Sequence, residues 1–121
     1  MKTIGIIGGG QLGQMMAISA TYMGHKVITL DPDPNCPASL VAEQIVAKYD
    51  DTAAIAKLAA RADVLTYEFE NVSADALAPY EDKLPQGLDL LRISQNRIFE
   101  KDFLFKAGVK VALYTIINTV E

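Results

Sequence analysis

The stretch IGIIGGGQLGQMM, residues 4–16, decides the fold. Its apolar start, residues 4–7, predicts a short buried strand, and the glycine run leads directly into a pattern with apolar residues spaced as on one face of a helix. Gly24 then ends the predicted helix, a second apolar strand covers residues 26–30, and Asp31 lies at its carboxyl end. This order of elements indicates a βαβ unit, in which the two strands are parallel.

The glycine run has the chemistry of a helix N-terminus. Gly8, Gly10 and Gly13 match the pattern G-x-G-x-x-G, whose glycines allow a tight turn, a close ligand approach and close packing of helix on strand. The first amide groups of a helix have no partner within it and favour a polar or anionic ligand. The match therefore predicts a Rossmann-like scaffold, while the ligand stays open because this scaffold has many functions.

The rest of the chain continues the alternation of strands and helices. Asp50 or Asp51 can cap one predicted helix, Ser73 can cap another, and Gly108 is suited to end the last. The further predicted elements are a strand at 44–47, a helix at 52–61, a strand at 63–67, a helix at 74–80 and a helical stretch at 89–106. We therefore predict an α/β fold with a parallel sheet flanked by helices.

The carboxyl end of the predicted sheet carries an acidic residue, and the end of the chain is apolar. Glu68 follows the strand at 63–67, and carboxyl ends of parallel strands face the ligand crevice, so we expect Glu68 to face the glycine turn. Residues 109–120 are rich in β-branched and apolar residues and predict a strand that needs partners. Such a strand suits the start of a further domain or an edge covered in an oligomer.

Composition excludes several classes of protein. The net charge of −4 and pI near 4.9 argue against binding to nucleic acid or an anionic membrane. With one cysteine, Cys36, and one histidine, His25, we expect no disulfide and no metal site in the chain. We expect Met15, Met16 and Met23 to fill the core. The chain shows neither a signal peptide nor an apolar run long enough to span a membrane, and we expect a cytoplasmic protein.

Four motifs in this order resemble the N5-carboxyaminoimidazole ribonucleotide synthetase family. They are IGGGQLGQMM at residues 7–16, LDPD at 30–33, TYEFENV at 66–72 and QNRIFEK at 95–101. The resemblance covers essentially the whole chain and implies the pre-ATP-grasp form of the Rossmann-like fold. It also implies an enzyme of purine biosynthesis that uses ATP, Mg²⁺ and bicarbonate to carboxylate the exocyclic amine of aminoimidazole ribonucleotide, commonly as a homodimer.

The same resemblance implies roles for particular residues. The backbone of Gly10, Gln11 and Leu12 and the carboxylate of Glu68 would bind the ribonucleotide, and Arg97 would contact ATP phosphates. A carboxylate can accept hydrogen bonds from an amine, and a guanidinium suits phosphate oxygens. No catalytic residue and no metal ligand is carried over onto this chain.

Two departures from the family pattern matter. The run at 108–111, GVKV, lacks the proline that family members usually have there. Family enzymes are also about three times as long, so the resemblance implies a pre-ATP-grasp domain at 1–107 and the start of an ATP-grasp domain at 108–121. We expect this chain to be inactive alone.

Alternatives remain at the level of the sequence. Asp31 lies about twenty residues after the glycine motif, where NAD(P)-binding domains of oxidoreductases place the acid that holds the ribose hydroxyl. A third hypothesis is an interaction module that dimerises through the apolar segment 109–117. The glycines can also serve packing alone, Glu68 can be a solvated residue at a strand end, and Arg97 can form a surface ion pair.

Overall fold

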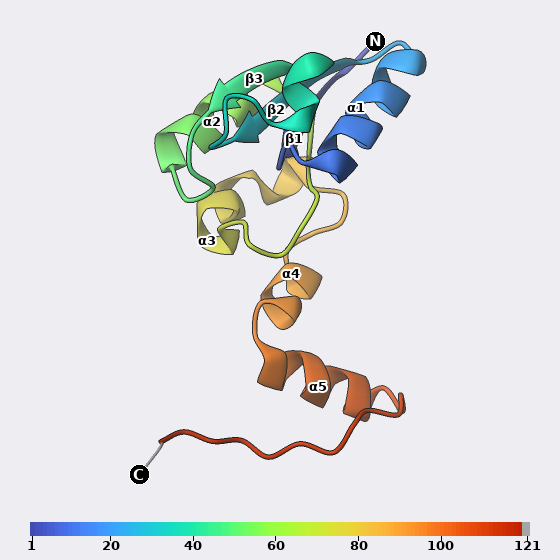
Figure 1. The fold of residues 1–121 in the computed structure, drawn as a ribbon, viewed down its shortest axis with the longest axis vertical. Coiled ribbons are helices and arrows are strands. Elements are labelled where there is room, and N and C mark those ends of the chain that lie inside the picture. The colour runs from blue at the N-terminus through green and yellow to red at the C-terminus, as the bar shows by residue number, and fades with distance from the viewer. Residues whose placement is uncertain (120–121) are drawn as a thin grey trace. The chain divides into compact units, whose positions relative to one another are not determined.

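Four parallel strands form one sheet in the computed structural model, which describes residues 1–119 (Figure 1). The strands are β1 (Thr3–Ile7), β2 (Lys26–Asp31), β3 (Glu43–Val46) and β4 (Val64–Tyr67). Their order is β3-β2-β1-β4, so β1 and β2 are central and pair in register from Thr3 with Lys26 to Ile7 with Leu30. Both central strands are apolar and buried toward their carboxyl ends, as parallel strands covered on both faces require.

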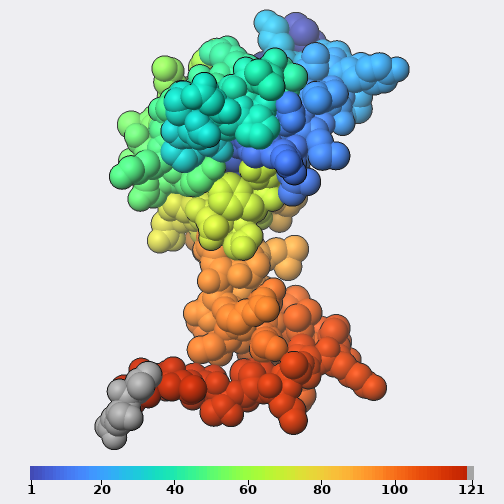
Figure 2. Space-filling model, in the orientation of Figure 1, coloured from blue at the N-terminus to red at the C-terminus, as the bar shows by residue number. Residues whose placement is uncertain are grey.

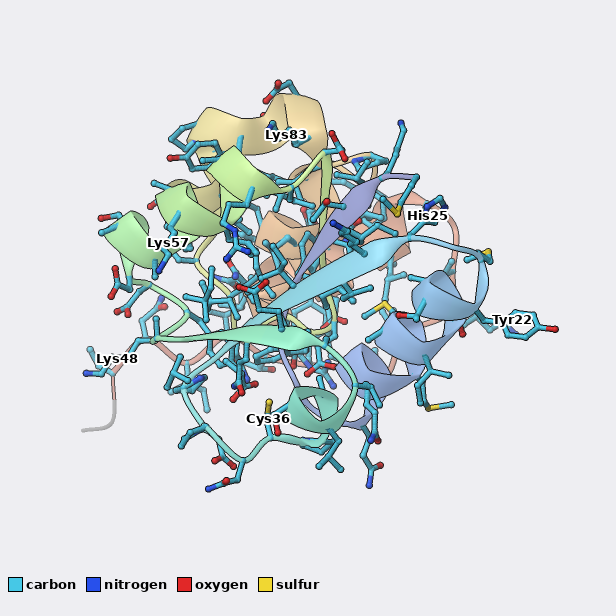
Figure 3. All side chains as sticks on the ribbon, turned by 90° about the horizontal axis from the view of Figure 1, so that it is seen from above. Tyr22, His25, Cys36, Lys48, Lys57 and Lys83 are labelled. Atoms are coloured by element: carbon cyan, nitrogen blue, oxygen red, sulfur yellow. The ribbon has the colours of Figure 1, made fainter. Side chains whose placement is uncertain are left out.

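Helices cover both faces of this sheet, which confirms the predicted α/β fold. Figure 3 shows α1 (Gln11–Tyr22) and the 3₁₀ helix η1 (Pro37–Leu40) on one side of the strands and α2 (Thr52–Arg61) on the other. The remaining helices are α3 (Ala74–Leu77), the 3₁₀ helix η2 (Ala78–Lys83), α4 (Asp89–Ser94) and α5 (Arg97–Lys106).

The chain divides into two compact units. The first covers Met1–Leu88 and contains the whole sheet, and the second begins at Asp89. Figure 2 shows the residues of the first unit, coloured blue to yellow, as one closely packed body. The predicted domain boundary at residue 107 remains a prediction, since a division into compact units does not test where an ATP-grasp domain begins.

Helix α1 presents a different face to the sheet from the one that we expected. Its buried residues are Gly13, Ala17 and Ala20, whereas Met15 and Met23 are 62% and 66% exposed. The prediction that these two methionines fill the core is wrong. Small side chains at this contact let the helix axis lie close to β1 and β2, and the longer apolar side chains then fall outside the contact.

Helix α2 agrees with the prediction in its bounds. Ile55, Leu58 and Ala59 are buried, and the Asp51 carboxylate caps the helix by accepting a hydrogen bond from the Ala54 amide at 2.9 Å. Ser73 likewise caps α3, although this helix ends at Leu77 and continues as η2.

Of two predictions for the second unit, one is confirmed and one is wrong. The helical stretch expected at 89–106 is present as α4 and α5, with a break where Asn96 leaves the helical conformation and caps α5. The expected strand at 109–120 is absent from residues 109–119, and residue 120 lies outside the described part. A strand needs a neighbour for its backbone groups, and none is present for this segment in residues 1–119. Gly108, with φ of +80°, ends α5 as predicted.

Candidate functional site

The glycine turn connects β1 to α1 at the carboxyl edge of the sheet. Gly8 has φ of +106°, a conformation that favours glycine, and its N–H donates to the Leu30 carbonyl at 2.9 Å. The Gly13 position within α1 lies so close to the Gly8 carbonyl that a side-chain carbon at Gly13 would overlap it. The glycines at these two positions are therefore required by the turn itself and by the packing of helix on strand.

Glu68 closes this turn from the end of β4. Its Oε1 accepts a hydrogen bond from the Gly10 amide at 3.0 Å, and its Oε2 accepts one from the Gly13 amide. Its own N–H donates to the Ile7 carbonyl at 3.1 Å, which places it directly beside β1. The predicted position of Glu68, facing the glycine turn, is confirmed.

The carboxylate of Glu68 therefore satisfies two donors at the positive end of α1. Within residues 1–119 the amides of Gln11 and Leu12 donate to no such partner and remain available as donors. Both residues are exposed, with Leu12 at 59%. The first turn of α1 thus offers two free N–H groups beside a partly buried carboxylate that has lone pairs left to accept from a ligand.

Asp31 is engaged on both carboxylate oxygens. Its Oδ2 accepts from the Gly9 amide at 2.8 Å and from the Tyr49 hydroxyl at 2.6 Å, and its Oδ1 accepts from the Asp33 amide at 2.9 Å. The residue is 6% exposed. Its contacts are those of a residue that orders the turn and the following loop, so the geometry does not favour the ribose-binding role that motivated the NAD(P) alternative.

Tyr49 lies between this acid and the segment that carries Glu68. Besides its bond to Asp31, its ring contacts the ring of Phe69 edge to face, with centroids 4.9 Å apart and planes at 76°. Burial, the hydrogen bond to Asp31 and the negative charges of Asp31 and Glu68 raise the pKa of Tyr49 well above its ordinary value. Tyr49 was not among the residues predicted from the sequence, although it follows a predicted strand at the ligand-facing edge, and that position was a usable signal.

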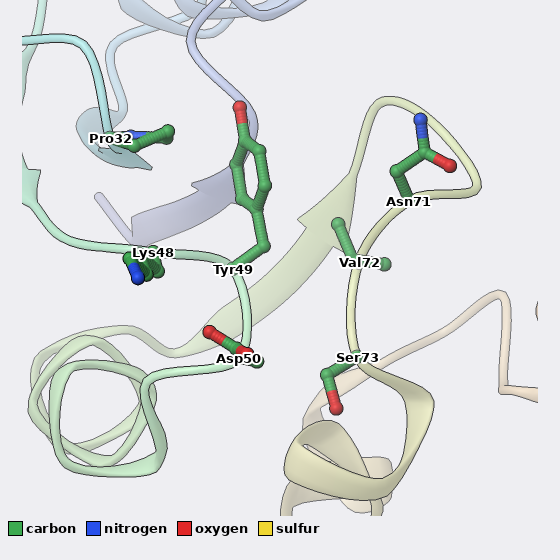
Figure 4. A pocket seen from close by; sticks show the side chains of 7 residues that line it. All are labelled: Pro32, Lys48, Tyr49, Asp50, Asn71, Val72 and Ser73. Atoms are coloured by element: carbon green, nitrogen blue, oxygen red, sulfur yellow. The ribbon is translucent and has the colours of Figure 1, made fainter.

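A pocket of about 340 Å³ opens beside Tyr49 (Figure 4). Tyr49 extends into it from between Lys48 and Asp50. The pocket is lined by Pro32, Lys48, Tyr49, Asp50, Asn71, Val72 and Ser73. Its walls come from the segments that follow β2, β3 and β4, so it lies at the edge where ligands of open parallel sheets bind.

Arg97 lies in the second unit, at the first position of α5. Its side chain is 80% exposed and pairs with Glu100 at 2.7 Å, three residues along the same helix. Exposed ion pairs of this kind contribute little to stability, so the guanidinium can leave Glu100 and bind another anion with little loss of free energy. A surface ion pair was the alternative to phosphate binding that the sequence left open for Arg97. The contact of Arg97 with ATP phosphates stays a prediction.

Cys36 is 3% exposed, and its burial raises the pKa of its thiol, with the nearby charges of Asp31 and Asp33 acting in the same direction. A protonated buried thiol is unreactive. Within residues 1–119 no three side chains of the metal-ligating types lie together. No helix in this described part is long and apolar enough to cross a membrane.

The first 87 residues match the family described as the ribonucleotide synthetase preATP-grasp domain. The chain is also 53% identical over 119 residues to the N5-carboxyaminoimidazole ribonucleotide synthase of Bacillus subtilis (strain 168), a match that covers 96% of this chain and 31% of that protein. The chain thus spans about a third of the length of the curated relatives that it matches.

Solved structures give the same result. A crystal structure of an ADP complex of N5-carboxyaminoimidazole ribonucleotide synthetase is similar with a TM-score of 0.89 and 54% identity, over 94% of this chain and 31% of that one. The Aspergillus clavatus N5-carboxyaminoimidazole synthase, solved with ADP and 5-aminoimidazole ribonucleotide, is similar with a TM-score of 0.83 and 31% identity, over 93% and 31%. These comparisons give no support to the oxidoreductase alternative.

Proposed function

The chain belongs to the ribonucleotide synthetase preATP-grasp domain family, and from this premise we propose that its glycine turn binds aminoimidazole ribonucleotide. Binding by this unit would serve the ATP-dependent N-carboxylation of the ribonucleotide, the activity of a longer protein of the N5-carboxyaminoimidazole ribonucleotide synthetase type. One observation carries the proposal: Glu68 is held at the start of α1 beside two free amide donors.

The chemistry of the turn suits a small ligand that has both donors and acceptors. The N–H groups of Gln11 and Leu12 can donate to acceptor atoms of the ligand, and the dipole of α1 strengthens these bonds. Gly10 contributes its backbone by holding Glu68 in place at 3.0 Å. The carboxylate can then accept from the exocyclic amine, which is the group that the reaction carboxylates.

We propose a separate role for Arg97 in the second unit. Its exposed guanidinium, paired only weakly with Glu100, would contact ATP phosphates, for which a planar bidentate donor is well suited. Complexes of the relatives with ADP support nucleotide use by the longer protein. Use of Mg²⁺ and bicarbonate, a homodimeric state, cytoplasmic location and an ATP-grasp start near residue 108 stay predictions from the family resemblance.

The test is an amide NMR titration of this chain with aminoimidazole ribonucleotide, using Glu68→Gln as the variant. We expect the ligand to shift the amides of residues 8–13, and we expect Glu68→Gln to weaken binding about tenfold, since a charged acceptor is lost. Glu70→Gln is the matched control. Glu70 is exposed and lies two residues after Glu68, so the variant removes the same charge from a neighbouring position. In the longer protein, Glu68→Gln should lower kcat/KM for the ribonucleotide.

Three results would contradict the proposal. They are the absence of any shift at millimolar ribonucleotide, equal weakening by the Glu68 and Glu70 variants, and shifts at the glycine turn and Asp31 on titration with NADH. The last would restore the oxidoreductase alternative.

A further inference from the structure

We propose that Tyr49 is a positioning residue that sets the orientation of the glycine turn for ligand binding. The inference rests on the proposed function, in which the turn binds the ribonucleotide. Tyr49 lies in the loop between β3 and α2 and contacts both segments that form the site. It acts through these contacts and not through the ligand.

The first contact runs through Asp31 to Gly9. The hydroxyl of Tyr49 donates to Oδ2 of Asp31 at 2.6 Å, and the same oxygen accepts the Gly9 amide at 2.8 Å. On its other side, the carbonyl of Gly9 accepts from the Ala38 amide at 2.9 Å. Both polar groups of the Gly9 backbone are thus held, the amide by Asp31 at the end of β2 and the carbonyl by Ala38 of η1. The hydroxyl of Tyr49 helps to hold the Asp31 carboxylate in this orientation.

The Gly9 position is closely packed, because a side-chain carbon there would overlap the sulfur of Cys36 and would lie 3.0 Å from Cβ of Asp31. The Asp31 carboxylate is linked to Gly9 by the hydrogen bond from the Gly9 amide. In this proposal, a reoriented carboxylate would weaken that bond or shift the Gly9 amide with it. Since Gly10, Gln11 and Leu12 follow directly, their amides move with it.

The second contact reaches the segment of Glu68. The edge-to-face packing of Tyr49 on Phe69, at 4.9 Å between centroids, holds the residue next to Glu68. The Tyr49 side chain thereby contacts both parts of the site. Its hydroxyl stabilises the turn that carries the amide donors, and its ring stabilises the segment that carries the Glu68 carboxylate. The raised pKa of Tyr49 agrees with this role, because only the protonated hydroxyl can donate to Asp31.

The experiment compares Tyr49→Phe with Tyr67→Phe in this chain. Tyr67 is the matched control, since its hydroxyl also makes one hydrogen bond, to the Gly87 carbonyl at 3.2 Å, and not to the turn. For Tyr49→Phe we expect amide hydrogen exchange at Gly9 about fivefold faster, and a Kd for aminoimidazole ribonucleotide raised by a similar factor. Tyr67→Phe should leave both quantities unchanged.

Phe69→Leu separates the two contacts. This variant removes the ring partner of Tyr49 but keeps the hydrogen bond from Tyr49 to Asp31. We therefore expect a higher Kd for the ribonucleotide, with the hydrogen-exchange rate at Gly9 unchanged. Unfolding temperatures of all variants, measured in parallel, show whether a change in Kd merely follows stability.

Two results would overturn the positioning role. One is a Gly9 exchange rate in Tyr49→Phe equal to that of the unaltered chain, and the other is the same loss of affinity in both tyrosine variants. If the unaltered chain does not respond to the ribonucleotide, the proposed function fails. The Gly9 exchange rates then still decide whether Tyr49 orients the turn.

Discussion

Glu68 supplies to helix α1 the cap that its own first residue lacks. The N-cap position is Gly10, which has no side chain, and the carboxylate that replaces it comes from 58 residues further along the chain. A capping side chain contributed by the same segment would occupy the turn and remain there. Because the capping carboxylate comes from the residue after β4, no side chain of the turn itself covers the start of α1. The amides of Gln11 and Leu12 therefore stay available as donors.

The glycine at position 8 should be the most sensitive residue of the turn. In Gly8→Ala the new methyl group would overlap Cγ of Glu68 in a backbone with φ of +106°, so we expect a loss of about 2 to 3 kcal/mol in the free energy of unfolding. Gly24→Ala is the control, because Gly24 has φ of +84° with no atom within 4 Å of the added carbon, and it should lose only about 1 kcal/mol. Equal losses in urea denaturation would show that Glu68 yields freely.

Among the helices, α2 and α5 have equal lengths and similar caps but differ in burial. Each has ten residues and an N-cap side chain that accepts from the first turn, Asp51 in α2 and Asn96 in α5. Helix α2 buries three apolar residues, whereas α5 buries none. Short helices are marginal without tertiary packing, so the cap should matter more for the persistence of α5.

Removal of the two caps should therefore have different consequences. We expect Asn96→Ala to increase hydrogen exchange throughout α5 without altering the unfolding temperature of the sheet. Asp51→Ala should lower the free energy of unfolding of the first unit by about 1 kcal/mol and lower its unfolding temperature accordingly. Helix α2 should stay helical until the first unit unfolds. Local melting of α2 in the native state, or a fall in sheet stability with Asn96→Ala, would contradict this distinction.

The whole molecule consists of units with very different cores. The first unit has fully buried large side chains on both sides of its sheet, among them Ile6, Leu30, Leu58 and Leu65. In the second, the aromatic residues Phe99 and Phe105 of α5 are 59% and 70% exposed, and residues 109–119 form no strand. Such exposed apolar surface is typical of a segment that packs on another surface.

Native-state hydrogen exchange should divide the molecule at the same place. We expect amides of β1 and β2 to exchange only through global unfolding of the first unit. Amides of α5 should exchange orders of magnitude faster, and those of residues 109–119 at rates near those of an unfolded chain. Uniform protection from β1 to α5 would show that the chain unfolds as one cooperative body.

Features that depend on neighbours in the sequence were predicted well. Periodicity, capping and glycine conformation within a few residues predict the bounds of α2, the end of α5 at Gly108 and the βαβ start. They also predict a cap of α2 by Asp50 or Asp51, and the structure selects Asp51. The predictions that failed required knowledge of partners. Met15, Met23 and the segment 109–119 have the right apolar character, but whether they are buried or paired depends on distant parts of the chain. Met16, by contrast, is partly buried and packs against the core as predicted.

The sequence by itself determined the α/β fold, the place of the glycine turn, the resemblance to one family and the expectation that Glu68 faces the turn. Only the tertiary structure decided how the site is held: Glu68 as the cap of α1, Asp31 as the anchor of Gly9, and Tyr49 as the brace between them. The physical reason is range. A strand or a turn follows from local conformational preference, whereas a hydrogen bond between Gly10 and Glu68 exists only because the pairing of β4 with β1 brings them together.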